Sequence, residues 1–151
     1  MIDYLRVARI DHWLKNIFIV FGHAVAVVLA LDLEFGGDIL RLAFLSLIPA
    51  CLIASANYIL NEILDAPFDK LHPRKRARPI PAGKVSVPIL WGIMAGCIAA
   101  GFALAFWWFG NPGYWFSLGL LLLSGLAYNV PPLRLKDRAF LDVIAESFNN
   151  P

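Results

Sequence analysis

The sequence predicts an all-α protein that crosses a membrane several times. Of its 151 residues, 60% are hydrophobic and 16% are charged, whereas soluble domains average about 45–50% apolar and about 25% charged residues. The apolar residues form long runs, and the basic residues gather in alternate segments between them. A soluble globule of this size could not bury so much apolar surface, so we expect the bilayer to be the solvent.

Each apolar run has about the length of a transmembrane helix. The runs cover about residues 13–31, 39–60, 87–109 and 114–130, and a fifth begins near residue 139. A helix needs about 20 residues to cross about 30 Å of hydrocarbon. The first run lacks the basic region, short apolar core and cleavage site of a signal peptide. We therefore expect four transmembrane helices and the start of a fifth. In the third run, Gly92, Gly96 and Gly101 predict close helix packing.

The charges orient these helices and exclude other classes of protein. Basic residues precede the first run and fill the segments after the second and fourth runs, whereas residues 32–38 and 110–113 carry no Lys or Arg. By the positive-inside rule, we expect the N-terminus and both basic loops to face the cytoplasm. In a prokaryote, the membrane would be the plasma membrane. A net charge of +2 is too balanced for a nucleic-acid binder. Cys51 and Cys97 lie in apolar runs and predict core residues, not a disulfide or metal site.

A cluster of oxygen-bearing side chains follows the second run. Asn61, Asp65 and Asp69 recur at a spacing of four, and Glu62 adds a carboxylate. Each step of four turns a helical position by only about 40°, so the three side chains share one side of a helix. Carboxylates at a membrane boundary are costly unless something binds them. Mg²⁺ suits such oxygens and completes its shell with substrate phosphates. Pro67 predicts that the helix ends early and leaves Asp69 on the loop.

The next segment of the chain is basic. It carries Arg74, Lys75, Arg76 and Arg78, and arginine in particular holds phosphate oxygens with bidentate geometry. Cytoplasmic loops are basic in any case, and acidic residues are common at solvated helix ends. An acidic cluster followed directly by a basic loop is harder to explain in those terms, and the pair predicts a clamp for a metal-bound diphosphate.

Three motifs resemble those of the UbiA superfamily of intramembrane prenyltransferases. The run NEILDAPFD at residues 61–69, followed by HP at 72–73 and RP at 78–79, resembles the first aspartate-rich motif of that family, with Glu62 where aspartate is usual. Residues 9–16 resemble the R-x-x-x-W-x-K-N start of its first helix. Residues 128–136 resemble the Y-S-x-P-P-x-R-x-K loop after its fourth helix. The resemblance covers essentially the whole chain.

This resemblance implies about nine transmembrane helices around a cavity that opens to lipid, and a Mg²⁺-dependent reaction. An isoprenoid diphosphate loses pyrophosphate, and the allylic cation alkylates an acceptor in the membrane. By the same resemblance, the metal and the diphosphate are held by Asn61, Asp65 and Asp69. The expected cationic contacts to the substrate are Lys15, Arg74 and Arg78. Tyr128 and Arg134 lie at the cavity mouth or serve only as interfacial anchors.

Several alternatives stay open. The family has a second aspartate-rich motif, and the sequence contains no match to it. We therefore expect residues 1–151 to be the N-terminal half of a longer domain. We also expect this half to be inactive without the C-terminal half. One subgroup of the family instead transfers phosphoribose to a polyprenyl phosphate, also with Mg²⁺. A transporter or membrane scaffold is the other class considered, but a transport pathway predicts charges deep in the membrane. The ionisable residues here gather on one side, which favours a catalytic mouth.

Overall fold

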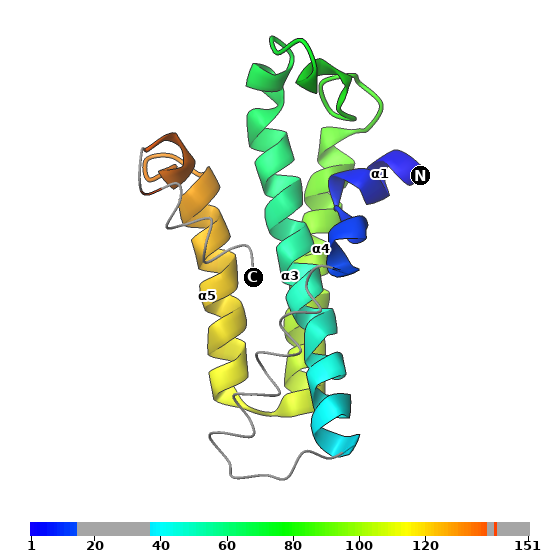
Figure 1. Cartoon of the computed structure of the whole chain (residues 1–151), viewed down its shortest axis with the longest axis vertical. Coiled ribbons are helices and arrows are strands. Elements are labelled where there is room, and N and C mark those ends of the chain that lie inside the picture. Colours follow the sequence, from blue (N-terminus) through cyan, green and yellow to red (C-terminus); the bar gives the residue numbers. More distant parts are fainter. Residues whose placement is uncertain (15–36, 139–140, 142–151) are drawn as a thin grey trace.

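The computed structural model describes residues 1–14, 37–138 and 141, and all regular structure in those residues is helical (Figure 1). The predicted first run beyond residue 14, Lys15 and nearly all of the predicted fifth run lie outside this part of the chain. Three long helices carry the fold: α3 (Gly37–Asp69), α4 (Val87–Phe109) and α5 (Pro112–Asn129). The shorter elements are the helix α1 (Ile2–Val7) and the 3₁₀ helices η1 (Ile10–Leu14), η2 (Lys75–Ala77) and η3 (Leu135–Asp137).

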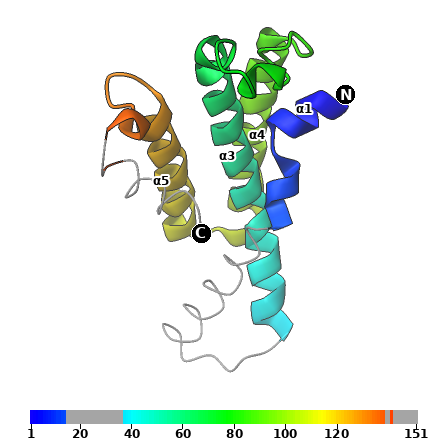
Figure 2. The ribbon, with the colours of Figure 1, turned by 45° about the horizontal axis from the view of Figure 1, so that its top comes forward.

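Helix α3 is the central element and contacts both α4 and α5. The N-terminal segment, the loop after α3 and the loop after α5 lie toward one end of these helices, whereas the short α4–α5 connection lies at the other end (Figures 1 and 2). The three basic segments are therefore brought to the same end of the helices, as their alternation along the chain predicts.

The ends of α4 and α5 follow from local sequence. Helix α4 closes at Gly110, which takes the left-handed conformation (φ +51°) that a glycine adopts without steric cost. Helix α5 begins at Pro112, and the side chain of Asn111 caps it by accepting a hydrogen bond from Gly113 N at 2.8 Å. Helix α4 coincides with the predicted run 87–109, and α5 begins two residues before the predicted residue 114 and ends one residue before 130.

The expectation that Pro67 ends the second helix is wrong. Helix α3 continues through Pro67 to Asp69, and Lys70 N still donates to Ala66 O at 3.1 Å. A proline removes only its own N–H donor, and here that loss falls in the last turn of the helix, where few bonds remain to be disturbed. Asp69 is consequently placed by the helix and not by the loop.

Among the described residues, two helices are long and apolar enough to cross a membrane, namely Arg41–Asp69 within α3 and Val87–Phe109. Half of the apolar stretch of α3 is buried inside the protein, against 17% for α4. Helix α4 thus leaves most of its apolar surface uncovered by the described residues. The count of four transmembrane helices stays a prediction.

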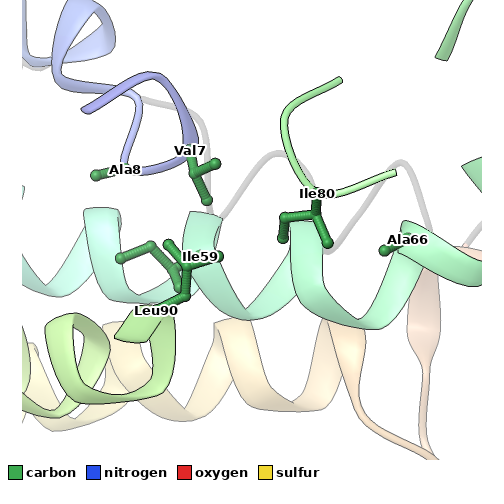
Figure 3. Close-up of a cluster of buried hydrophobic side chains, with 6 residues drawn as sticks. All are labelled: Val7, Ala8, Ile59, Ala66, Ile80 and Leu90. Carbon is green, nitrogen blue, oxygen red and sulfur yellow. The ribbon is translucent and has the colours of Figure 1, made fainter. Parts of the chain in front are cut away.

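A buried apolar cluster underlies the basic end of the helices. It joins residues from the N-terminal segment, α3, the loop after α3 and the start of α4 (Figure 3): Val7, Ala8, Ile59, Ala66, Ile80 and Leu90. Because these residues come from four parts of the chain, the cluster fixes the last turns of α3 against both the loop and the N-terminus. Each fully buried aliphatic side chain of this kind contributes about 1.5–3 kcal/mol.

Small residues allow α3 to approach its two neighbours. A Cβ atom at Gly125 of α5 would lie 2.1 Å from Cγ of Asn57, so any larger residue at this crossing requires the Asn57 side chain to move. At the α3–α4 crossing, a Cβ at Gly101 would lie 3.3 Å from the backbone oxygen of Pro49. The predicted packing role is confirmed for Gly101. For Gly92 and Gly96 it stays a prediction, because a Cβ at either position meets nothing within 4 Å in the part of the chain that the structure describes.

Candidate functional site

The site lies where the last turns of α3 meet the loop after α5. Asn61 and Asp65 are one turn apart on α3, and Asn129 is the last residue of α5. The side-chain oxygens of these three residues, which we call the oxygen triad, converge on the ammonium group of Lys136. Its Nζ atom donates to Oδ1 of Asn61 at 2.9 Å, of Asp65 at 2.5 Å and of Asn129 at 3.1 Å.

Arg134 adds a second cation to the same carboxylate. Its Nη2 atom lies 3.4 Å from Oδ1 of Asp65, and its Nε atom lies 2.7 Å from Oδ2 of Asp137. The guanidinium also stacks over the ring of Phe68, with 5.0 Å between its central carbon and the ring centre. Arg134 itself has a positive φ of 32°, which turns the chain back toward α3.

Asp69 belongs to a different group of charges. It is 4% exposed, and its Oδ2 atom accepts from Nη1 of Arg78 at 2.7 Å. Lys75 is more distant, with its Nζ atom 3.9 Å from Oδ1 of Asp69. Among the described residues, Asp65 and Asp69 therefore share neither of their cationic partners, although both belong to the last two turns of α3.

The basic loop is ordered by its own backbone. The Nδ1 atom of His72 accepts hydrogen bonds from the backbone N–H groups of Arg74, at 3.2 Å, and Lys75, at 3.3 Å. The side chains of Arg74 and Arg76 are exposed. The loop thus offers solvent-facing cations beside the buried Asp69–Arg78 pair.

Glu62 is a buried carboxyl group beside the site. It is 5% exposed, and its Oε1 atom has no hydrogen-bond partner among the described residues. It lies one position after Asn61, which turns it about 100° around the helix. Arg78 and Arg9 are the cations that act on it electrostatically.

The N-terminal motif docks on α3 just before Asn61. The indole N–H of Trp13 donates to Oγ of Ser55 at 3.0 Å, and the guanidinium of Arg9 lies 5.2 Å from the ring centre of Tyr58. His12 meets the same ring edge-on at 5.4 Å between centroids. The N-terminal segment therefore packs against α3, the helix that carries Asn61 and Asp65.

The structure brings together only some of the predicted site residues. Asn61, Asp65 and Arg134 lie together, and Asp69 pairs with Arg78 in a separate group. Tyr128 is half-buried on α5. Sequence reasoning missed two members of the site, Lys136 and Asn129. Lys136 stands at the last position of the third motif, which was a signal for it. Asn129 stands at the second position of the same motif, where the family pattern has serine, so the motif did not mark it as a ligand.

The donors present fit a hard cation. In the described part of the chain, no three His, Cys, Asp or Glu side chains cluster as metal ligands. The oxygen triad instead combines one carboxylate with two amide oxygens, which are ligands that Mg²⁺ and Ca²⁺ accept, and it already surrounds a positive charge. Asn61 and Asp65 fit the predicted metal site, and Asp69 lies in the neighbouring charge group.

Residues 17–148 match the family model described as the UbiA prenyltransferase family. The chain belongs to this family. The UbiA match covers most of the chain and includes α3 and both basic loops. It also includes Lys136 and the three residues of the oxygen triad.

Individual UbiA relatives differ in their named activities. The chain is 29% identical to decaprenyl-phosphate phosphoribosyltransferase of Mycolicibacterium smegmatis over 104 residues, which are 69% of this chain and 32% of that protein. It is 34% identical to homogentisate phytyltransferase of Synechocystis sp. over 118 residues, 76% of this chain and 33% of that protein. Nodulation protein NoeC of Azorhizobium caulinodans is 34% identical over 84 residues, 55% of this chain and 25% of NoeC. The chain spans about a third of the length of such relatives or less.

Proposed function

We propose that this chain forms the first metal- and diphosphate-binding part of a membrane enzyme that transfers a prenyl group from an isoprenoid diphosphate to an acceptor. The observation that carries the proposal is the oxygen triad, which surrounds the ammonium group of Lys136. The triad lies beside two basic loops at one end of the helices. Membership of the UbiA prenyltransferase family and the similarity to homogentisate phytyltransferase support the choice of prenyl transfer.

We assign metal binding to the end of α3 and phosphate binding to the loop that follows it. Asn61 and Asp65 would hold Mg²⁺, with Asp69 nearby. When bound, Mg²⁺ neutralises the charge that develops on the departing diphosphate. Arg78 and the exposed Arg74 stand on the loop after α3, from which guanidinium groups can hold phosphate oxygens in bidentate fashion. Lys15 is a further cationic contact expected from the family motif.

Arg134 and Tyr128 would line the other side of the site. Arg134 reaches Asp65 from the loop after α5 at 3.4 Å, and Tyr128 lies on the last turn of α5. A donor bound at the triad would therefore meet cations from both loops. We place this end of the helices on the cytoplasmic side of the membrane because the basic segments gather there.

Phosphoribosyl transfer to a polyprenyl phosphate is the second candidate. It is favoured by the similarity to decaprenyl-phosphate phosphoribosyltransferases of Mycolicibacterium smegmatis and Corynebacterium glutamicum, each 29% identical. Both candidates use a phosphorylated donor, and the described residues would serve either. A transporter is less well supported, because the charged cluster comes from the last turns of α3 and the loop after α5 and not from the middle of the helices.

One assay separates these candidates. The product of the complete reading frame, in lipid nanodiscs with Mg²⁺, is given phytyl diphosphate with homogentisate, and separately phosphoribosyl diphosphate with decaprenyl phosphate. We expect transfer in the first reaction. Transfer only in the second would establish the alternative, and transfer in neither would exclude both of these reactions.

The matched variants are Asp65→Asn and Asp3→Asn. Asp65 contacts the Lys136 ammonium, whereas Asp3 pairs only with Arg6 near the N-terminus in the described structure. Asp65→Asn should lower kcat by at least about 100-fold, as expected when a charged group that acts on the transition state is lost. Asp3→Asn should retain wild-type turnover.

A further inference from the structure

The ammonium of Lys136 is coordinated as a metal ion would be. A lysine ammonium has three N–H donors and no acceptor. Here all three donors have oxygen partners, which come from Asn61, Asp65 and Asn129. The Lys136 side chain is only 11% exposed, so water does not compete strongly for these bonds. A simple ion pair would need only the carboxylate of Asp65.

Asn129 is held so that its oxygen faces this cation. The residue is 3% exposed, and its Nδ2 atom donates to the backbone oxygen of Gly125 at 2.9 Å. With the amide nitrogen tied to the preceding turn, Oδ1 is directed at Lys136 Nζ, 3.1 Å away. A buried amide with one end fixed and the other end on a cation is a preorganised oxygen ligand.

We infer that Lys136 is a built-in cation that occupies the metal position in the ligand-free protein, and that Asn129 is the third protein ligand of the metal that replaces it. This inference rests on the proposed function for the identity of that metal, a divalent cation. Lys136 and the metal compete for the same three oxygens, so metal binding requires the lysine to leave.

The loop allows that exchange. Lys136 lies in η3, and the segment between Asn129 and Arg134 has an exposed stretch at residues 131–133. Moving the lysine therefore does not require the apolar cluster beneath α3 to open. Asp65 keeps Arg134 as a partner when Lys136 is absent, since Arg134 Nη2 lies 3.4 Å from the same oxygen.

Competition of this kind sets the apparent affinity for metal. The apparent dissociation constant rises as the inverse of the fraction of molecules whose site is open. If Lys136 fills the triad in nine molecules of ten, removing its charge should tighten metal binding about tenfold.

The test measures Mn²⁺ binding by electron paramagnetic resonance on the product of the complete reading frame, in phosphatidylcholine nanodiscs. Lys136→Met removes the ammonium group and keeps an unbranched side chain of similar length. Arg138→Gln is the matched control, because it removes one positive charge from the same loop and its side chain bonds only Pro132 O in the described structure. We expect about tenfold tighter Mn²⁺ binding for Lys136→Met and less than about threefold for Arg138→Gln.

A second variant isolates Asn129. Asn129→Ala in the Lys136→Met protein should weaken Mn²⁺ binding at least about tenfold, because losing even a group that only orients a metal ligand commonly lowers metal affinity by about 10–100-fold. Equal Mn²⁺ affinity in Lys136→Met with and without Asn129→Ala would overturn its assignment as a ligand.

A measurement on the wild-type protein does not depend on any variant being folded. If Mg²⁺ displaces Lys136, reductive methylation of this amine should become faster when Mg²⁺ is added, whereas that of the exposed Lys84 should not change. Unchanged Lys136 labelling, or Mn²⁺ affinity that is equal in wild type and Lys136→Met, would overturn the inference even if prenyl transfer is observed. Conversely, tighter Mn²⁺ binding without any transfer would leave the inference standing and contradict the proposed function.

Discussion

We predict that Gly125→Ala destabilises the crossing of α3 and α5. The new Cβ would lie 2.1–2.3 Å from three side-chain atoms of Asn57, so Asn57 must retreat by at least about 1 Å to reach ordinary contact. That retreat breaks the bond from Asn57 Nδ2 to Leu121 O, now 3.0 Å long. Interhelical bonds of this kind contribute about 0.6 kcal/mol and at most about 1.7 kcal/mol in a membrane.

Overpacking adds about 1–3 kcal/mol, so Gly125→Ala should lower the free energy of unfolding by about 1.5–4.5 kcal/mol in total. Gly119→Ala is the matched control, because it changes the same residue type in the same helix at a position where a Cβ meets no described atom within 4 Å. We expect that control to be neutral or to stabilise by up to about 1 kcal/mol through helix propensity. The assay is reversible unfolding in mixed micelles with increasing dodecyl sulfate, followed by far-ultraviolet circular dichroism.

A double-mutant cycle tests the cause. In an Asn57→Ala background the obstructing atoms are gone, so Gly125→Ala should cost less than about 0.5 kcal/mol, with the difference appearing as coupling between the two sites. If the full cost persists in that background, contact with Asn57 is not the reason for glycine at this position. The reasoning about the crossing would then be refuted.

Three other changes have defined outcomes. Asp69→Asn removes a charge-assisted bond of 2.7 Å to Arg78 and should cost about 1–3 kcal/mol in the same unfolding titration; a cost equal to that of Asp3→Asn would contradict this. His72→Ala removes the acceptor of two backbone N–H groups of the basic loop and should speed tryptic cleavage there several-fold in a timed digest, which an unchanged rate would disprove. Gly101→Leu should destabilise the α3–α4 crossing by at least about 1 kcal/mol, whereas Gly96→Leu should not; equal melting temperatures for the two variants would argue against the crossing.

The helices could be predicted because their cause is local. Residues 87–109 form an apolar run of the right length, and α4 covers the same residues. Pro67 misled the prediction, because its effect depends on where in the helix it falls, and α3 runs on to Asp69. The glycines of α4 show the same limit. All three are small, but among the described residues only Gly101 meets a neighbouring helix, and sequence spacing does not tell which face of α4 meets α3.

The site was predicted in part for the same reason. The spacing of four placed Asn61 and Asp65 together, since helix geometry alone decides it. Asn129 and Lys136 join them only because the loop after α5 turns back onto α3, and the turn includes the left-handed conformation of Arg134. That contact joins residues about 70 positions apart in the chain, which no local pattern reveals.

Burial separates the two explanations that the basic residues allow. A loop that is basic only because it faces the cytoplasm needs no partners, and its cations stay in water. Arg74 and Arg76 are exposed and fit that description as well as they fit phosphate binding. Lys136 does not, because an 11% exposed ammonium must recover its lost hydration from protein oxygens. The exposed Arg74 and Arg76 of the loop after α3 and the buried Lys136 of the loop after α5 therefore need different explanations, although all three belong to the basic segments.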